Sequence, residues 1–318
     1  MDASVQTQTL TFLRRPDNWL VRLFDYKPFL IVMCLMPAIG LLAVFLTYPL
    51  GLGIWLSVTD STIGQPGTFI GLANFAALAD DPVFWMSVTN TIFYTGTTTI
   101  AKLILGLWLA LLLNNHFPFK SLIRAVVLLP FIVPTVLSAI AWWWIYSPQF
   151  SIISYVLMRL HLIDSYINFL GTPWAARWSL VVANIWRGIP FIAITLLAGL
   201  QTISPSLYEA ALIDGASGWQ RFRRITLPML TPILSVVMTL TILFTFTDFQ
   251  LVYALTRGGP FNTTHLMATL AFQRAIPGTQ LGEGAAIAVA MIPFLLAATL
   301  ATYFGLGRRK WQQGGRDD

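Results

Sequence analysis

The sequence reads EAALIDGA at residues 209–216, where it forms a short polar island between two strongly apolar segments. Ser204 can cap a helix whose first residue is a proline, and Gly215 can adopt the left-handed conformation that ends a helix. We therefore predict a short helix over residues 205–214. A second helical stretch, residues 219–227, leads into the next apolar segment.

The composition of this short helix suits contact with another protein. Ala210 and Ala211 remove side-chain bulk, so a groove of a partner can approach the backbone closely. Leu207, Tyr208 and Leu212 offer apolar contacts on the same helix. The alternative interpretation is an ordinary interfacial helix that connects two membrane spans.

The composition places the chain among integral membrane proteins. Hydrophobic residues make up 56% of the sequence and charged residues only 10%, whereas charged residues are about a quarter of a typical soluble domain. The mean hydropathy is +0.71. The sequence contains a single cysteine, Cys34, which lies in an apolar segment. One cysteine cannot form a disulfide framework or a cysteine metal site, so both are excluded.

Six apolar segments are long enough to cross a membrane, since a hydrocarbon core about 30 Å thick requires a helix of about 20 apolar residues. They cover residues 29–57, 87–113, 125–146, 178–200, 229–256 and 284–307. The first contains Pro37 and Pro49, so we expect a tilted or kinked helix and treat it as one uncleaved span. The sequence thus predicts an all-α membrane domain over residues 29–307.

Lysine and arginine residues indicate the orientation of these spans. The segments before the first span, between the second and third, between the fourth and fifth, and after the sixth carry 13 of them, whereas the alternate loops carry four. Because such residues are enriched on the cytoplasmic side, we predict that residues 1–28, 201–228 and 308–318 face the cytoplasm. The formal charge of +6 then reflects membrane topology and does not indicate nucleic-acid binding.

The cytoplasmic loop 201–228 resembles the EAA loop of binding-protein-dependent ABC importer permeases. The matching residues are Glu209, Ala210, Ala211, Asp214, Gly215, Ile225, Leu227 and Pro228. The resemblance implies a type I ABC importer permease (MetI-like) fold with six transmembrane helices. In that family the loop is the coupling helix that docks into an ATPase subunit, so the first five of these residues are expected to contact the ATPase.

Three further motifs are similar to those of the carbohydrate-uptake branch of this family. They are FIGLANF at residues 69–75, LPFIVP at residues 129–134 and LTRGGP at residues 255–260. The resemblance implies a complex of this chain with a second permease subunit, two ABC ATPase subunits that bind ATP and Mg²⁺, and an extracytoplasmic solute-binding protein. It places that complex in the lipid of the bacterial inner membrane, with no cofactor held by this chain.

Two otherwise apolar spans each carry a stripe of candidate site residues that includes polar side chains. In the fourth span they recur at i, i+3, i+4 and i+7, and in the fifth at i, i+4 and i+7. These residues are Asn184, Arg187, Gly188 and Phe191, followed by Thr241, Thr245 and Asp248. By resemblance, they and Phe131 and Thr135 of the third span occupy positions that contact the sugar in a maltose permease. Polar groups can bind sugar hydroxyls, and aromatic rings can stack on a pyranose.

Helix packing is the alternative interpretation for the glycine and threonine positions. The charged residues are harder to explain, because an ionised side chain at the bilayer centre costs about 2.5 to 3.5 kcal/mol or more unless it meets a partner or water. Arg187 and Asp248 either pair, which suits the favoured neutral sugar, or lie apart, which frees Arg187 for a carboxylate or phosphate. We expect Lys102, in the second span, to extend its long side chain toward the membrane surface.

Enzymatic functions find no support in the sequence. It contains neither a GxxxxGK[ST] phosphate loop nor HExxH, and its three histidines are dispersed without ligand spacing. We therefore predict the permease subunit of an ATP-driven, binding-protein-dependent importer, which moves an oligosaccharide or a sugar derivative, acidic or phosphorylated derivatives included, by alternating access. The alternatives are an ATPase-independent secondary transporter or channel for a small polar solute, and a membrane-embedded enzyme.

Overall fold

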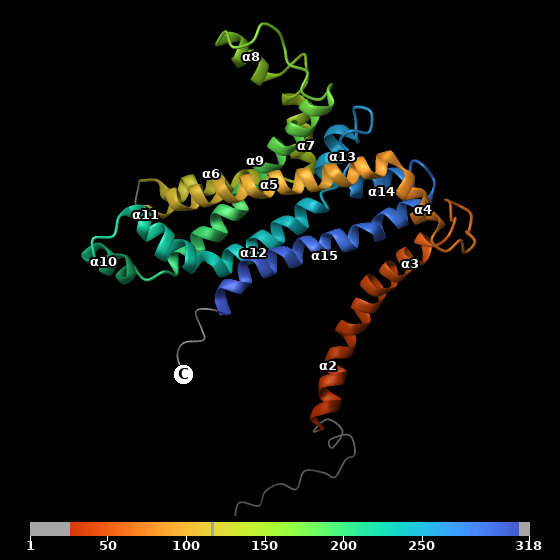
Figure 1. The fold of residues 1–318 in the computed structure, drawn as a ribbon, viewed down its shortest axis with the longest axis horizontal. Helices are drawn as coiled ribbons and strands as arrows, with labels where there is room; N and C mark the ends of the chain where they lie inside the picture. Colours follow the sequence, from red (N-terminus) through yellow and green to blue (C-terminus); the bar gives the residue numbers. More distant parts are fainter. Residues whose placement is uncertain (1–25, 116–117, 312–318) are drawn as a thin grey trace, which may run out of the picture. The chain divides into compact units, whose positions relative to one another are not determined.

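The structure, a computed structural model, describes residues 26–115 and 118–311 (Figure 1). These residues form helices joined by turns, and the described part of the chain has no β-strand beyond two isolated bridges. The predicted all-α class is therefore confirmed. Most of the predicted cytoplasmic segment 1–28 and of the tail 308–318 lies outside the described residues.

The chain divides into two units, residues 1–52 and 53–318. The first unit contains α2 (Lys27–Leu42), a π-helical turn η1 (Ala43–Thr47) and the start of α3 (Tyr48–Ser57). Together they form one apolar helix of 31 residues, the predicted first span. The wide turn η1 contains Phe45, four residues before Pro49, and a proline has no N–H to donate to the carbonyl of that residue in a regular α-helix.

Four long helices form the frame of the second unit. They are α5 (Pro82–Asn114), α9 (Pro173–Gln201), α12 (Leu227–Phe246) and α15 (Leu281–Trp311). The start of α5 shows why such a helix begins where it does: Asp81 accepts a hydrogen bond of 2.8 Å from the Val83 N–H, and Pro82 occupies a position that needs no donor.

Small residues let α5 and α9 pack closely along their length. A Cβ atom added to Gly106 of α5 would lie 2.6 Å from Cγ2 of Ile192 on α9, so the glycine is required for this contact. Nearby, Ala110, Leu196 and Leu230 are fully buried in one apolar cluster that joins α5, α9 and α12. Burial of this cluster fixes the three helices beside one another.

The predicted third span is wrong in one respect, because it is not a single helix. It consists of α6 (Lys120–Ile132) and α7 (Thr135–Ile145), which are bent by 91° at the break between them. Val133 is extended because it precedes Pro134, which disfavours the helical conformation for the residue before it. The hydropathy of the segment is continuous across this break and therefore concealed it.

The predicted fifth span is also interrupted. Helix α12 ends at Phe246, and α13 (Gln250–Thr256) begins after a short non-helical link. Among the described residues, five helices are long and apolar enough to cross a membrane, or six if the bent pair α6–α7 is one span. This number agrees with the predicted six-span architecture.

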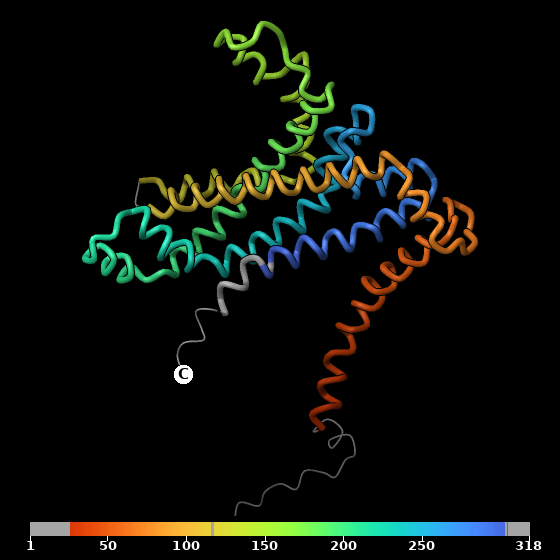
Figure 2. Tube along the Cα trace, in the orientation of Figure 1, coloured from red at the N-terminus to blue at the C-terminus, as the bar shows by residue number. Residues whose placement is uncertain are grey.

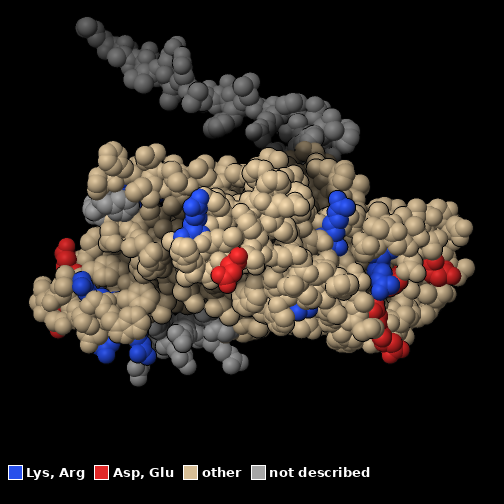
Figure 3. All heavy atoms as spheres, turned by 90° about the horizontal axis from the view of Figure 1, so that it is seen from above, with Lys and Arg blue, Asp and Glu red and all other residues tan. Residues whose placement is uncertain are grey.

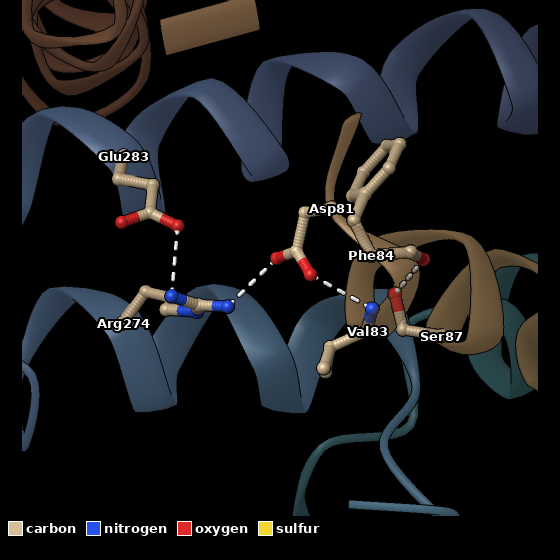
Figure 4. A network of polar contacts seen from close by, with 6 residues as sticks. All are labelled: Asp81, Val83, Phe84, Ser87, Arg274 and Glu283. Carbon is tan, nitrogen blue, oxygen red and sulfur yellow. Dashed lines mark hydrogen bonds and ion pairs between the residues drawn. The ribbon is translucent and has the colours of Figure 1, made fainter. Parts of the chain in front are cut away.

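Three short helices, α4 (Ala73–Asp80), α8 (Ile152–Arg159) and α14 (Met267–Ala275), lie in the alternate loops. The side chain of Arg274 joins two helix starts, with 2.7 Å from its Nη2 to Asp81 before α5 and 3.2 Å from its Nη1 to Glu283 in α15 (Figure 4). These ion pairs tie α14 to α5 and α15 at one end of the second unit.

The EAA loop contains α10 (Pro205–Ile213), α11 (Gly218–Arg221) and a π-helical turn η2 (Phe222–Thr226) that runs into α12. Figure 2 shows this loop at the end of the second unit where α5 ends and α6 begins, opposite the end at which α4 lies. Gly215 ends the first helix with φ of +73°, the predicted left-handed conformation. Ser204 precedes α10, but its side chain makes no capping hydrogen bond.

The outer surface of the bundle suits a hydrocarbon environment. Most of the face drawn in Figure 3 is uncharged. On α5, Ile100, Ile104 and Trp108 follow one another at intervals of four residues, and all three are exposed. A helix face of this kind is stable where it meets lipid or another apolar subunit.

Candidate functional site

A cavity of about 540 Å³ lies where the two interrupted segments approach α9. Its wall includes Phe131 and Thr135 on either side of the α6–α7 break and residues 247–250 at the α12–α13 break. Non-helical backbone at membrane depth is stable only where protein covers it or where it lines a cavity. The two breaks therefore serve to bring polar groups to the pocket wall.

The structure brings all nine residues of the predicted sugar site to this one pocket. They are Phe131, Thr135, Asn184, Arg187, Gly188, Phe191, Thr241, Thr245 and Asp248. The wall also contains five residues that the sequence analysis did not assign to it, namely Lys102, Phe244, Thr247, Phe249 and Gln250. The volume lies within the range of about 300–1,000 Å³ that is usual for small-molecule sites.

Asp248 is held by three hydrogen bonds and is buried, with 7% of its surface exposed. The hydroxyl of Tyr94 and the amide Nδ2 of Asn184 both donate to its Oδ2 at 2.8 Å. The backbone N–H of Leu251 donates to its Oδ1 at 3.3 Å. This carboxylate thus joins α5, α9 and the start of α13, and its acceptor positions are largely occupied.

The expectation for Lys102 is wrong, because its side chain points into the bundle. It is 4% exposed, and its Nζ donates to Oδ1 of Asn184 at 2.7 Å and to Oγ1 of Thr245 at 2.8 Å. Two neutral acceptors and a nearby carboxylate make this burial less costly than extension through lipid. The signal that would have found it is a polar stripe on α5, which consists of Thr91, Thr95, Thr98 and Lys102.

Arg187 does not pair with Asp248. Among the residues that the structure describes, Arg187 has no hydrogen-bond or ion-pair partner, and its Nε is buried without an acceptor. The hydroxyl of Thr241 in the same pocket is also buried and unpartnered. The sequence left open whether Arg187 and Asp248 pair or lie apart, and in the structure they do not pair.

Two aromatic rings of the pocket lie against each other. Phe131 of α6 and Phe191 of α9 stack with a centroid distance of 5.6 Å and an interplanar angle of 24°. Phe249, which is also in the pocket wall, packs against Tyr253 of α13 and Phe272 of α14. Polar groups together with aromatic rings in one wall are suitable chemistry for a site that binds a sugar-like molecule.

The EAA loop presents a separate exposed surface. Glu209, Ala210 and Asp214 are exposed, Ala211 is half-buried, and the apolar Ile213 beside them is 88% exposed. The hydroxyls of Tyr208 in α10 and Thr226 in η2 are 2.9 Å apart and share a hydrogen bond. This contact fixes α10 to the helical segment that continues into α12.

An all-helical, multi-pass membrane bundle with an internal polar pocket and an exposed helical loop is the architecture of a transport permease. Residues 102–308 match the family described as "Binding-protein-dependent transport system inner membrane component". The chain belongs to this family of inner-membrane ABC transporter permeases, and the resemblance seen in the sequence is confirmed.

Two relatives show how far this similarity extends. The chain is 35% identical to the trehalose/maltose transport system permease protein MalF of Thermococcus litoralis, over 92% of this chain and 98% of that protein. It is also 35% identical to the sulfoquinovosyl glycerol transport system permease protein SmoG of Agrobacterium fabrum, over 88% of this chain and 91% of that protein.

Solved structures confirm the fold. A chain of a bacterial ABC transporter involved in the import of the acidic polysaccharide alginate superimposes with a TM-score of 0.78, 24% identity and coverage of 90% of this chain and 99% of that chain. A chain of the MetNI methionine ABC transporter superimposes with a TM-score of 0.54 and 18% identity, over 72% of this chain and 98% of that chain. The predicted MetI-like permease fold is therefore correct.

Proposed function

We propose that this chain is the permease subunit of an ATP-driven, binding-protein-dependent importer of an oligosaccharide or a sugar derivative. The observation that carries the proposal is the pocket at the two helix breaks, which combines amide, hydroxyl, charged and aromatic side chains in about 540 Å³. The substrates in the names of its relatives, trehalose, maltose and sulfoquinovosyl glycerol, support a sugar.

The exposed EAA loop supports a role for an ATPase partner. Its small residues Ala210 and Ala211 and the exposed Ile213 suit insertion into a groove of another subunit. In the complete transporter a second permease would complete the translocation pathway, and two ATPase subunits would bind ATP and Mg²⁺. An extracytoplasmic binding protein would deliver the sugar.

A chain of contacts supports coupling of this loop to the pocket. The hydrogen bond between Tyr208 and Thr226 connects α10 to η2, and η2 continues into α12, which carries Thr241 and Thr245 in the pocket wall. A displacement of α10 by the ATPase would therefore move one wall of the pocket. Alternating access would use this movement to open the pocket to one side of the membrane at a time.

Reconstitution of the assembled transporter in proteoliposomes tests the proposed function. Uptake of sugar is expected to require ATP and the binding protein and to persist when ionophores remove the ion gradients. Uptake that follows an ion gradient without ATP would instead support a secondary transporter. A complex in which the binding protein does not stimulate ATP hydrolysis would contradict the proposed coupling.

The proposed orientation can be tested separately by labelling with a membrane-impermeant thiol reagent. In a Cys34→Ala background, a cysteine at Ser217 in the EAA loop is expected to react only after permeabilisation, and a cysteine at Gln65 in intact cells. The charge distribution of the loops supports this orientation. Labelling of position 217 in intact cells would overturn it.

A further inference from the structure

The charged groups of the pocket wall do not cancel one another. Lys102 and Arg187 are cations and Asp248 is an anion, so the described wall carries an excess of one positive charge. Lys102 lies close enough to Asp248 and to Arg187 to interact with each electrostatically. Because charge is weakly screened in a pocket inside a membrane protein, this excess strongly affects which substrates can bind.

Lys102 and Asp248 form one neutral unit within this set. Both bind Asn184, Lys102 at its Oδ1 with 2.7 Å and Asp248 at its Nδ2 with 2.8 Å. Asp248 receives its remaining hydrogen bonds from Tyr94 and from the backbone of Leu251. The carboxylate is therefore engaged away from Arg187 and does not supply its counter-charge.

Arg187 remains as the unbalanced cation. It has no hydrogen-bond or ion-pair partner within residues 26–115 and 118–311, and the buried Nε and the buried hydroxyl of Thr241 both lack partners. A guanidinium group binds carboxylate, sulfonate or phosphate oxygens through two parallel N–H donors, which is a stronger interaction than with a neutral hydroxyl. Arg187 is half-buried at the pocket wall, and an anionic group that enters the pocket would supply the counter-charge that the described residues do not provide.

We infer that the transported sugar is anionic and that its acidic group binds at Arg187. This inference rests on the proposed function, because it names the substrate class of the same pocket. The neutral groups around Arg187 then serve the sugar hydroxyls, and the Lys102–Asn184–Asp248 unit holds the wall in place. An acidic side chain of the second permease is the competing counter-charge, and it would leave the pocket suited to neutral sugars.

The test uses two pairs of sugars that differ in charge. In proteoliposomes that contain the complete transporter and its binding protein, uptake of digalacturonate is compared with that of the neutral digalactose, and uptake of sulfoquinovose with that of glucose. We expect at least one anionic sugar to enter with a kcat/KM at least about tenfold above that of its neutral counterpart, the difference equivalent to one strong charged interaction.

Variants of Arg187 connect this preference to the pocket. Arg187→Gln is expected to reduce uptake of the anionic sugar at least about tenfold. Arg187→Lys keeps the positive charge and is expected to retain a substantial part of the uptake that Arg187→Gln loses. The matched control is Arg159→Gln, which removes an exposed arginine of α8 outside the pocket. This control is expected to leave the preference between the two members of each pair unchanged.

Two readouts separate the failure of this inference from failure of the proposed function. A binding protein that does not stimulate ATP hydrolysis by the wild-type complex contradicts the proposed function. If stimulation is present, equal or faster uptake of the neutral sugars overturns the anionic substrate, as does the absence of uptake of both anionic sugars. Uptake of an anionic sugar that Arg187→Gln leaves unchanged shows that the acidic group does not bind at Arg187.

Discussion

Lys102 donates a hydrogen bond of 2.7 Å to the amide oxygen of Asn184, and the amide nitrogen of Asn184 donates one of 2.8 Å to Asp248. The amide thus separates a buried cation from a buried anion and satisfies both. Lys102 lies on α5, Asn184 on α9, and Asp248 in the link after α12. One amide group therefore holds together the three elements that form a wall of the pocket.

We predict that Lys102→Met disrupts this wall. The substitution leaves the acceptors on Asn184 and Thr245 unpaired and Asp248 without its nearby cation, which costs about 1–3 kcal/mol. The apparent melting temperature of the detergent-solubilised complex is expected to fall, together with the uptake rate. Lys120→Met, at the start of α6 and outside the pocket, is the control. An unchanged melting temperature of Lys102→Met would show that the network does not stabilise the bundle.

We predict that Tyr208→Phe weakens the connection between α10 and α12. The variant loses only the hydroxyl that binds Thr226 at 2.9 Å, a contact of about 0.5–1.5 kcal/mol. Assembly should persist, while the number of sugar molecules imported per ATP hydrolysed should fall several-fold. Tyr155→Phe on α8, whose hydroxyl is exposed, is the matched control. Equal transport stoichiometry in both variants would refute a coupling role for this hydrogen bond.

We predict that Gly215→Val impairs coupling, so that sugar uptake and binding-protein-stimulated ATP hydrolysis both fall while membrane insertion persists. A Cβ atom at this position meets no neighbouring atom within 4 Å, so the substitution acts through φ of +73° alone. A left-handed conformation costs a residue other than glycine about 1–2 kcal/mol, whereas asparagine tolerates it better. Gly215→Asn should therefore retain more of the binding-protein-stimulated ATPase activity than Gly215→Val. Equal activities would show that the turn geometry is not required.

We predict opposite effects for two glycines of the same helix. Gly106→Ala places a methyl group 2.6 Å from Ile192 and should destabilise the α5–α9 contact by about 1–3 kcal/mol. Gly96 faces open space, so Gly96→Ala should stabilise α5 by as much as about 1 kcal/mol through helix propensity. Thermal melting of the two purified variants measures both. Tolerance of Gly106→Ala would mean that the helices can separate without loss of stability.

We predict that acidification destabilises the loop between α13 and α14. Burial and the charge of Arg274 lower the pKa of His265 from 6.5 to about 4. Below pH 6.5 the unfolded chain binds a proton at His265, whereas the folded chain does so only below about pH 4. The free energy of unfolding therefore decreases as the pH falls from 6.5 to about 4. His265→Gln should reduce the loss of melting temperature between pH 7.5 and 5.0.

His161→Asn provides the control for this pH dependence, because it removes an exposed histidine that follows α8. It should leave the change in melting temperature between the two pH values as in the unmodified chain. If His265→Gln and His161→Asn behave alike, the pH dependence arises elsewhere in the complex.

The amino-acid sequence alone determined the features that depend on one segment at a time. Hydropathy identified the membrane class, because the length of an apolar helix reflects the thickness of the hydrocarbon. The spacing of Asn184, Arg187, Gly188 and Phe191 placed them on one face, because an α-helix repeats every 3.6 residues. Gly215 was identified as a left-handed helix end because only glycine adopts that conformation without steric cost.

Tertiary structure alone decided which of these faces meet and where the helices break. Lys102 finds Asn184 and Thr245 at sequence separations of 82 and 143 residues, and no local pattern specifies how two helices are rotated against each other. The separation of Arg187 from Asp248 depends on the same rotations and on the non-helical link after Phe246. Helix periodicity aligns residues within a span, whereas packing between spans determines which charges are neutralised and which remain available to a ligand.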